Sequence, residues 1–204
     1  KGCYMAFYLL HNYMDFIISM DNKKIIRQEI LSKRKTLSSE YYHEANKEII
    51  KKLISLKEFI DSKVIFMFVG LTGEVNTKPI KTIAQLENKV VAIPKIYPNR
   101  EMKAHKCLDW ETLSSHSFGV LEPDANSEVI SKEQIDLIII PCVSCDNEGH
   151  RLGYGGGYYD RYLQDSSAIK VLPCFSKLQS RTIPTEKHDI QADIVITEKG
   201  IYRK

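Results

Sequence analysis

The sequence predicts an α/β fold, a three-layer α/β/α sandwich around a mainly parallel sheet. Three segments, 64–69, 90–93 and 136–141, are short, mostly apolar runs of strand length. Such runs are typical of strands buried on both faces. Segments with helical periodicity separate them, and this alternation indicates a sheet covered by helices.

Two helices are expected before the first strand. From Asp21 to about Lys35, apolar residues recur at helical spacing, and Asp21 can cap this helix. Ser38 or Ser39 can cap a second helix of the same periodicity. Its apolar positions are Ala45, Ile49, Ile50, Leu53 and Ile54.

Beyond the first strand, helices and strands are expected to alternate. The pattern predicts helices over 77–88 and 157–164, and further strands over 169–175 and 193–197. The crossovers between parallel strands should be right-handed. The segment 96–130 is the least regular and could contain short antiparallel strands.

Length and composition favour one domain. A chain of 204 residues that is 43% hydrophobic can bury a sizeable core. We expect residues 20–204 to form that domain and residues 1–19 to be an N-terminal extension of unclear role. The apolar run 3–18 is too short and too broken by polar residues to cross a bilayer, and it lacks a clear cleavage site. These features predict a cytoplasmic protein with no membrane partner.

Charge and cysteine content narrow the class further. The net charge is only +3 and charges of both signs are interspersed, which argues against a nucleic-acid-binding tail and suits an anionic small ligand. Five cysteines, an odd number, make a disulfide framework improbable in a chain of this size. Cys142 and Cys145 form a C-x-x-C pair. The sequence has no second such pair, which a structural zinc site would need. We expect Cys142 and Cys145 to have a passive role rather than a redox one.

The most informative segment runs from Asp136 to Leu163. A buried strand ends at Pro141, a polar loop follows, and a glycine-rich stretch over 153–157 leads into a helix. Ligands in open α/β sheets bind beyond the carboxyl ends of strands, where glycines let backbone N–H groups approach an anion. The following helix would add the positive end of its dipole. The segment predicts phosphate binding, and the alternative is a sharp bend without a ligand.

Charged residues flank this loop. Arg151 and Arg161 could hold phosphate oxygens, and Asp160, early in the helix, could hold a magnesium ion that bridges phosphates. The loop is not a Walker A motif, because no Gly-Lys-Ser/Thr follows the glycines. It is not the dinucleotide fingerprint either, because Tyr158 occupies the place of the third glycine.

The segment RLGYGGGYYDRYL, preceded by P-x-x-x-x-D-x-x-G, resembles the signature of the 5-formyltetrahydrofolate cyclo-ligase family. Further segments resemble the family in order and spacing over residues 23 to 198. These are KKIIR from Lys23, Glu74 with Thr77, FGVLEP from Phe118, His188-Asp189, and VITE at 195–198. The resemblance implies a Rossmann-like sheet of the NagB/RpiA-like type. It also implies ATP- and Mg²⁺-dependent cyclisation of 5-formyltetrahydrofolate to 5,10-methenyltetrahydrofolate, with release of ADP and phosphate.

The resemblance assigns expected roles outside the loop. Lys23 would contact ATP, with Lys24 as the alternative if the register slips by one, and Arg27 would lie near ATP and the folate. Lys23 and Arg27 are four apart, on one helix face, which without the resemblance would be read as a solvated face. Val69 and Glu74 would contact the substrate, where a carboxylate suits the N–H groups of the pterin ring.

Within the loop, the resemblance implies contacts to the triphosphate and the formyl group. The loop residues concerned are Arg151, Gly153, Tyr154, Gly155, Gly156, Gly157, Tyr158 and Tyr159. Lys23, Arg151 and Tyr158 are the expected catalytic residues, and the stretch from Tyr154 to Tyr158 is also expected to bind substrate. Asp160 and Asp189 are the implied magnesium ligands.

His150 and His188 flank the proposed site and are expected to be solvated loop positions.

Two other functions are possible from the sequence. The first is that of a non-catalytic nucleotide- or RNA-binding homologue, although the moderate charge and the lack of an aromatic RNP-type motif argue against RNA. An isomerase or transferase of phosphorylated sugars is the second, and it would act without ATP. We expect a monomer whose partners are ATP and a folate, with no nucleic acid.

Overall fold

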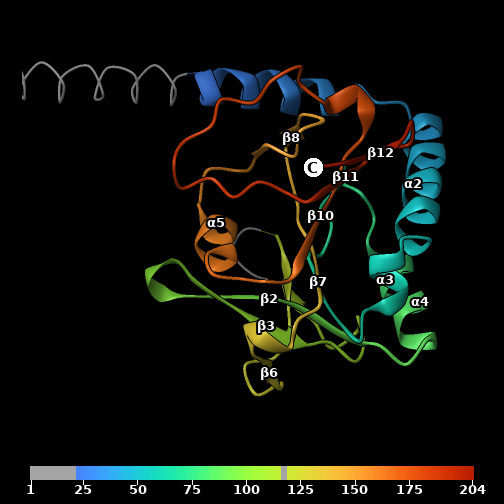
Figure 1. The fold of residues 1–204 in the computed structure, drawn as a ribbon, viewed down its shortest axis with the longest axis vertical. Helices are drawn as coiled ribbons and strands as arrows, with labels where there is room; N and C mark the ends of the chain where they lie inside the picture. The colour runs from blue at the N-terminus through green and yellow to red at the C-terminus, as the bar shows by residue number, and fades with distance from the viewer. Residues whose placement is uncertain (1–21, 116–118) are drawn as a thin grey trace, which may run out of the picture.

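The computed structural model describes residues 22–115 and 119–204, which contain a central eight-stranded sheet (Figure 1). Its strands are β1 (Val64–Met67), β2 (Val90–Tyr97), β3 (Glu101–Lys106), β6 (Val129–Ile130), β7 (Leu137–Ile139), β10 (Ile169–Pro173), β11 (Ile194–Ile196) and β12 (Ile201–Arg203). Two small ribbons lie outside it. They pair β4 (Ser114–Ser115) with β5 (Leu121–Glu122), and β8 (Ser144–Cys145) with β9 (Arg151–Leu152).

The strand order is β12-β11-β10-β7-β1-β2-β3-β6. The inner strands β11, β10, β7, β1 and β2 run parallel, whereas the outer pairings of β12 with β11, of β3 with β2 and of β6 with β3 are antiparallel. The mainly parallel sheet predicted from the apolar runs is therefore confirmed. Because the five parallel strands point the same way, the loops that follow their carboxyl ends gather at one end of the sheet.

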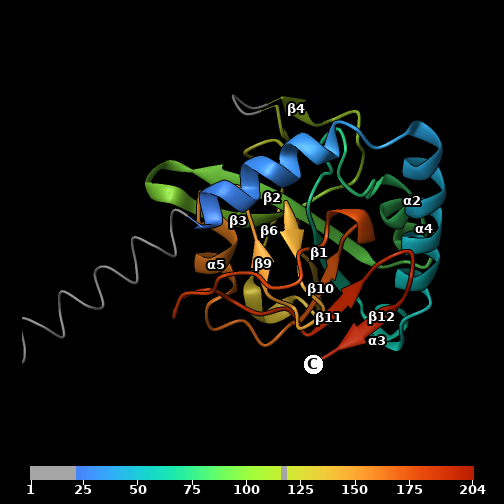
Figure 2. The same ribbon diagram turned by 90° about the horizontal axis from the view of Figure 1, so that it is seen from above.

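Helices cover both faces of the sheet, which gives the three layers (Figures 1 and 2). On one face lie α2 (Ser39–Ile54), α3 (Lys57–Asp61) and α4 (Lys78–Leu86), and on the other lies α5 (Tyr158–Leu163). The helical residues 22–34 lie across the end of the sheet that also carries β8 (Figure 1). Three short 3₁₀ turns complete the described elements: Pro98–Arg100, Lys132–Gln134 and Ser176–Leu178.

The apolar runs form the core. Within β1 and β7, residues such as Ile65, Phe66 and Ile138 have no exposed surface, as expected for strands covered on both sides. The strands β1, β7, β10 and β11 are shorter than the apolar runs that predicted them, since pairing stops where the chain turns toward the loops. In contrast, β2 extends to Tyr97, because β3 pairs with it from Ala92 to Tyr97.

Side-chain hydrogen bonds set several element boundaries. The Ser38 hydroxyl accepts the N–H of Tyr41 at 3.2 Å, so Ser38 caps α2. The helix predicted from residue 77 begins at Lys78, because the Thr77 hydroxyl instead donates to the carbonyl of Phe68 at 2.8 Å. Three predictions lie outside the described residues: the cap at Asp21, the extension 1–19, and Phe118.

The VITE segment ends in a half-buried contact between α2 and the chain that follows β10. The Glu198 carboxylate accepts the Tyr41 hydroxyl of α2 at 2.7 Å, and both the N–H and the hydroxyl of Ser176 after β10. Burial opposes the charge, but these hydrogen bonds hold the pKa of Glu198 below its usual value. Glu198 thus has a structural role in fastening α2 to the ends of the strands.

The described ranges include no helix that is both long enough and apolar enough to cross a membrane. The Rossmann-like, NagB/RpiA-like subclass stays a prediction.

Candidate active site

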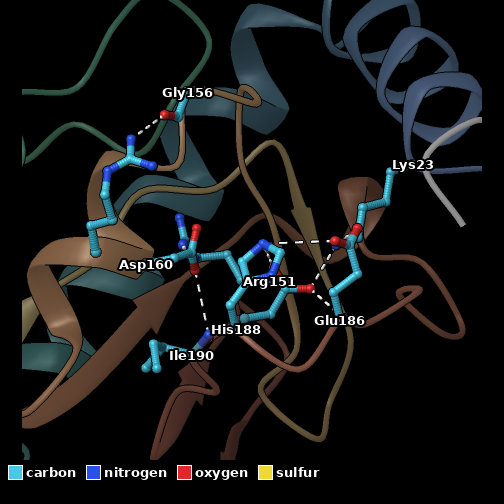
Figure 3. Close-up of polar contacts among 9 residues, drawn as sticks. Lys23, Arg151, Gly156, Asp160, Glu186, His188 and Ile190 are labelled. Carbon is cyan, nitrogen blue, oxygen red and sulfur yellow. Dashed lines mark hydrogen bonds and ion pairs between the residues drawn. The ribbon is translucent and has the colours of Figure 1, made fainter. Parts of the chain in front are cut away.

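Three segments meet beyond the carboxyl ends of the parallel strands: the helix 22–34, the β8–β9 hairpin with the glycine-rich loop 153–157, and the loop before β11 (Figure 3). Lys23 comes from the first, Arg151 and Asp160 from the second and the start of α5, and Glu186 from the third. Residues far apart in sequence therefore share one polar site, as the motif positions predict.

Lys23 faces this site. Its Nζ lies 2.8 Å from Glu186 Oε1 and 2.6 Å from Asp189 Oδ2, and only 13% of its side chain is exposed. Lys24 is exposed, because adjacent helix positions point about 100° apart. The structure therefore places Lys23, and not Lys24, against the acidic residues. The short loop containing Glu186 was not singled out in the sequence, where Glu186 had no motif position.

Arg27 lies one helical turn from Lys23 and contacts the glycine-rich loop. Its Nε donates a hydrogen bond to the carbonyl of Gly153 at 2.8 Å. A Cβ built on Gly155 would stand 3.7 Å from the guanidinium carbon, and the φ of Gly155 is +97°. Glycine is favoured there because a side chain would strain the backbone. Partial burial lowers the pKa of Arg27.

Arg151 and Asp160, which lie before and after the glycine-rich loop, form an ion pair with each other. Arg151 Nη2 donates to Asp160 Oδ1 at 2.5 Å, and the two side chains are 5% and 20% exposed. The same carboxylate oxygen accepts the N–H of Ile190 at 3.4 Å (Figure 3). Asp160 thus contacts the residue that follows Asp189, so the two expected magnesium ligands lie on adjoining segments.

The helix that follows the glycines was predicted to help bind an anion through its dipole, but it is too short for a large dipole. Residues Tyr158–Leu163 form only six helical residues, so the dipole is small. Gly157 precedes it with a φ of +65°, and Arg161 donates to the carbonyl of Gly156 at 2.6 Å. This bond ties Arg161 to the loop itself. The positive charge of the site comes mainly from Lys23, Arg27 and Arg151.

The tyrosines of the motif have different surroundings. Tyr158 is half-buried at the start of α5. Tyr159 stacks on Phe66 of β1, with ring centroids 6.3 Å apart, and its hydroxyl has no hydrogen-bond partner among the described residues. Burial raises the pKa of Tyr159 far above its ordinary value. Tyr159 therefore supports the loop from the core.

Glu74 anchors the other half of the site. It is 6% exposed, and its carboxylate accepts the Tyr154 hydroxyl at 2.6 Å and the N–H of Leu71 at 2.9 Å. Burial raises the pKa of Glu74, and the two hydrogen bonds and the nearby Arg34 oppose this shift only in part. Val69, two residues after the end of β1, is only 7% exposed and belongs to the apolar core.

Arg34 is a site residue that the sequence interpretation missed. Its Nη1 donates to the Tyr154 hydroxyl at 2.6 Å and lies 3.8 Å from Glu74 Oε1. Its Nη2 donates to the carbonyl of Cys142 at 3.1 Å. Arg34 is seven residues after Arg27, on the same helix face, and this spacing could have identified it. Tyr154, which was expected to bind ATP and substrate, bridges Glu74 and Arg34.

The carboxylates of the site fit the donor set of magnesium. Asp160, Asp189 and Glu186 offer the hard oxygen ligands that Mg²⁺ prefers, and both hydrogen bonds given to Asp160 in the described chain go to Oδ1. No three carboxylates of the described residues form a preformed cage. This agrees with an ion held by one or two carboxylates together with phosphate oxygens and water.

The two flanking histidines differ from each other. His188 is 71% exposed on its side chain, as expected. His150 was expected to be a solvated loop position, and this is wrong: its Nδ1 lies 2.9 Å from Asp146 Oδ2, and its side chain is 28% exposed. The Asp146 carboxylate also accepts the N–H groups of His150 and Ile183. These bonds hold the hairpin against the following loop.

The comparisons with known proteins agree with this geometry. Residues 19–198 match the model of the 5-formyltetrahydrofolate cyclo-ligase family. The chain is 29% identical to the 5-formyltetrahydrofolate cyclo-ligase of Haemophilus influenzae, over 85% of this chain and 96% of that one. It is 27% identical to the mouse 5-formyltetrahydrofolate cyclo-ligase, over 86% and 93%.

A solved structure is also similar. The 5,10-methenyltetrahydrofolate synthetase of Aquifex aeolicus superimposes with a TM-score of 0.79 and 33% identity, over 89% of this chain and 92% of that one. The fold, the placement of the motif residues and these matches lead to one conclusion. The chain belongs to the 5-formyltetrahydrofolate cyclo-ligase family.

Proposed function

We propose that this protein converts 5-formyltetrahydrofolate to 5,10-methenyltetrahydrofolate, with ATP and Mg²⁺ and with release of ADP and phosphate. The observation that carries the proposal is that Arg27 and Arg151 both lie against the glycine-rich loop 153–157, with Lys23 one helical turn from Arg27. Family membership supports the reaction. Cations beside a glycine-rich loop suit a triphosphate, and the buried Glu74 suits the N–H groups of a pterin.

In the proposed reaction the formyl oxygen attacks the γ-phosphorus of ATP, and ADP leaves. N10 then attacks the activated carbon and closes the five-membered ring, after which phosphate leaves and the N10 proton is released. Lys23 and Arg151 neutralise charge on the transferring phosphoryl group, while Arg27 and the N–H groups of loop 153–157 hold the phosphates. Tyr158, at the end of that loop, contacts the reacting groups in this proposal. Mg²⁺, held by Asp160 and Asp189, would supply further neutralisation of phosphate charge when bound.

Glu74 defines the proposed folate side of the site. Its carboxylate is already held by Tyr154 and Leu71, which keeps it oriented toward a substrate that donates hydrogen bonds. Arg34 fixes Tyr154 from the other side. Folate and ATP are the proposed partners, and the cytoplasmic location and the monomeric state stay predictions.

An absorbance assay for methenyltetrahydrofolate tests the function directly. The purified chain is mixed with 5-formyltetrahydrofolate, Mg²⁺ and ATP, and the reaction is repeated without ATP and with a chelator of Mg²⁺. We expect product only in the complete mixture. Turnover of a phosphorylated sugar without ATP would favour the isomerase class, and calorimetric binding of ATP without product would favour a non-catalytic homologue.

Substitution of Lys23 tests which lysine of the pair serves ATP. We expect Lys23→Ala to raise the KM for ATP or lower kcat by on the order of 100-fold in total, because a cation next to the phosphates is lost. Lys24→Ala is the matched control, since Lys24 is adjacent but exposed, and it should change neither constant by more than about threefold. Equal losses in both variants would contradict the assignment.

A further inference from the structure

Three cysteines that are separated in sequence meet under the candidate active site. Cys142 follows β7, Cys145 ends β8, and Cys174 follows β10. The strands β7 and β10 are parallel neighbours in the sheet, so the residues after their carboxyl ends come together. The C-x-x-C pair lacked a second pair in the sequence, and the fold supplies a third thiol from a distant strand.

The three sulfur atoms lie within 4.8 Å of one another, and none of the three residues is more than 8% exposed. All three are free thiols. In the part of the chain that the structure describes, this is the one group of three or more potential ligands whose ligand atoms converge.

We propose that Cys142, Cys145 and Cys174 bind a single soft d¹⁰ metal ion, Zn²⁺ or Cu⁺. Thiolates select such ions over Mg²⁺. A zinc–sulfur bond of about 2.3 Å places the sulfurs of a trigonal or tetrahedral site about 4 Å apart. Small side-chain adjustments from the observed separations therefore complete the site. On binding, each thiol that becomes a ligand releases its proton to solvent.

The surroundings suit this occupant in charge and in space. Three thiolates and Zn²⁺ carry one net negative charge, and Arg34 lies close by, donating to the carbonyl of Cys142 at 3.1 Å. A cavity of about 10 Å³ is lined by Cys142, Cys174 and Glu74, among others. It is about large enough for one water molecule, which could serve as a fourth ligand.

The position of the cluster indicates a structural role for the ion. Cys145 pairs with Arg151 across the β8–β9 hairpin, and Cys142 stands at the start of that hairpin. A metal bound to both and to Cys174 would fasten the hairpin to the end of β10. The ion would thereby hold the segment that presents Arg151, without touching the phosphates. This inference does not depend on the proposed reaction.

Metal titration of the full chain tests the proposal. Protein stripped with a chelator under reducing conditions is titrated with Zn²⁺ against a chromogenic zinc chelator, and separately with Cu⁺ against a cuprous chelator. We expect one equivalent of Zn²⁺ or of Cu⁺ to bind per chain. Failure of both ions to compete with chelators of micromolar affinity would overturn the proposal.

Cysteine variants locate the site. We expect Cys145→Ala and Cys174→Ala to weaken binding by on the order of 100-fold or more, because each removes one of three ligands. Cys107→Ala is the matched control, since Cys107 is also buried and free but lies outside the cluster, and it should bind as the parent does. Equal binding in all three variants would overturn the proposal.

A measurement on the unsubstituted chain covers the case in which an alanine variant does not fold. X-ray absorption of the loaded protein should show three sulfur ligands at about 2.3 Å. A shell of nitrogen and oxygen alone would overturn the site. Detection of a disulfide among the three cysteines, with no metal uptake after its reduction, would show a redox pair instead.

Discussion

Arg151→Lys is expected to lower kcat of the cyclo-ligase reaction by on the order of 100- to 1,000-fold. Arg151 is 5% exposed on its side chain and contacts Asp160 at 2.5 Å. A lysine keeps the charge but loses the planar fork, so it cannot serve the carboxylate and a phosphate oxygen together. Steady-state kinetics with varied ATP and fixed 5-formyltetrahydrofolate measures the effect.

Arg203→Lys is the control for this substitution. Arg203 also pairs with a carboxylate, that of Glu58, but the pair lies at the β12 edge, and 51% of the Arg203 side chain is exposed. We expect its kinetics to match those of the parent. Melting temperatures of both variants separate a catalytic loss from a folding defect. An Arg151→Lys variant that folds and retains full kcat would refute the role of Arg151 in phosphoryl transfer.

Glu74→Gln is expected to raise the KM for 5-formyltetrahydrofolate by about 100-fold, equivalent to about 2.7 kcal/mol. The amide keeps the shape of the side chain but presents a donor where the pterin needs an acceptor. A buried hydrogen bond to a charged group contributes about 1.5 to 3 kcal/mol, which matches this loss. Kinetics with varied folate and saturating ATP tests the prediction.

The same substitution should leave stability intact or improve it. Burial raises the pKa of Glu74 in the folded state above the ordinary carboxyl value of 4.5. The folded state then binds a proton more tightly than the unfolded state, so this residue makes the fold less stable as pH rises from 4.5 through the folded-state pKa. Glu74→Gln removes that penalty, and its melting temperature relative to the parent should rise across this window.

The affinity for the folate should increase as pH rises, whereas the contribution of Glu74 to stability decreases. If the carboxylate form of Glu74 binds the pterin, folate affinity weakens as pH falls through the raised pKa of Glu74. Glu122→Gln is the matched control, because Glu122 is also buried, but it accepts the N–H of Ile96 at 3.3 Å and pairs with Lys95 of β2 rather than with Tyr154 and Arg34. It should leave the KM for folate unchanged. A parallel rise in KM in both variants would refute a direct contact from Glu74.

The local sequence pattern was sufficient to predict the inner strands, the glycine-rich loop and the family of this protein. The apolar runs predicted the inner strands, because a strand buried on both faces has no polar positions. Glycines at positions such as 155 and 157, where φ is positive, marked the loop beyond β9. The spacing of Lys23 and Arg27 predicted that both face one side of a helix. The motif residues predicted the family, which the comparisons then showed.

Contacts through space were decided only by the tertiary structure. The strand order brings the end of β10 beside the end of β7, and so joins Cys174 to Cys142 and Cys145. The packing of helix 22–34 on the loops selected Lys23 over Lys24 and placed Arg34 against Tyr154. Periodicity encodes which face of an element is buried, but not which element packs against it. That choice depends on strand order and loop path, and these follow from the packing of the whole chain.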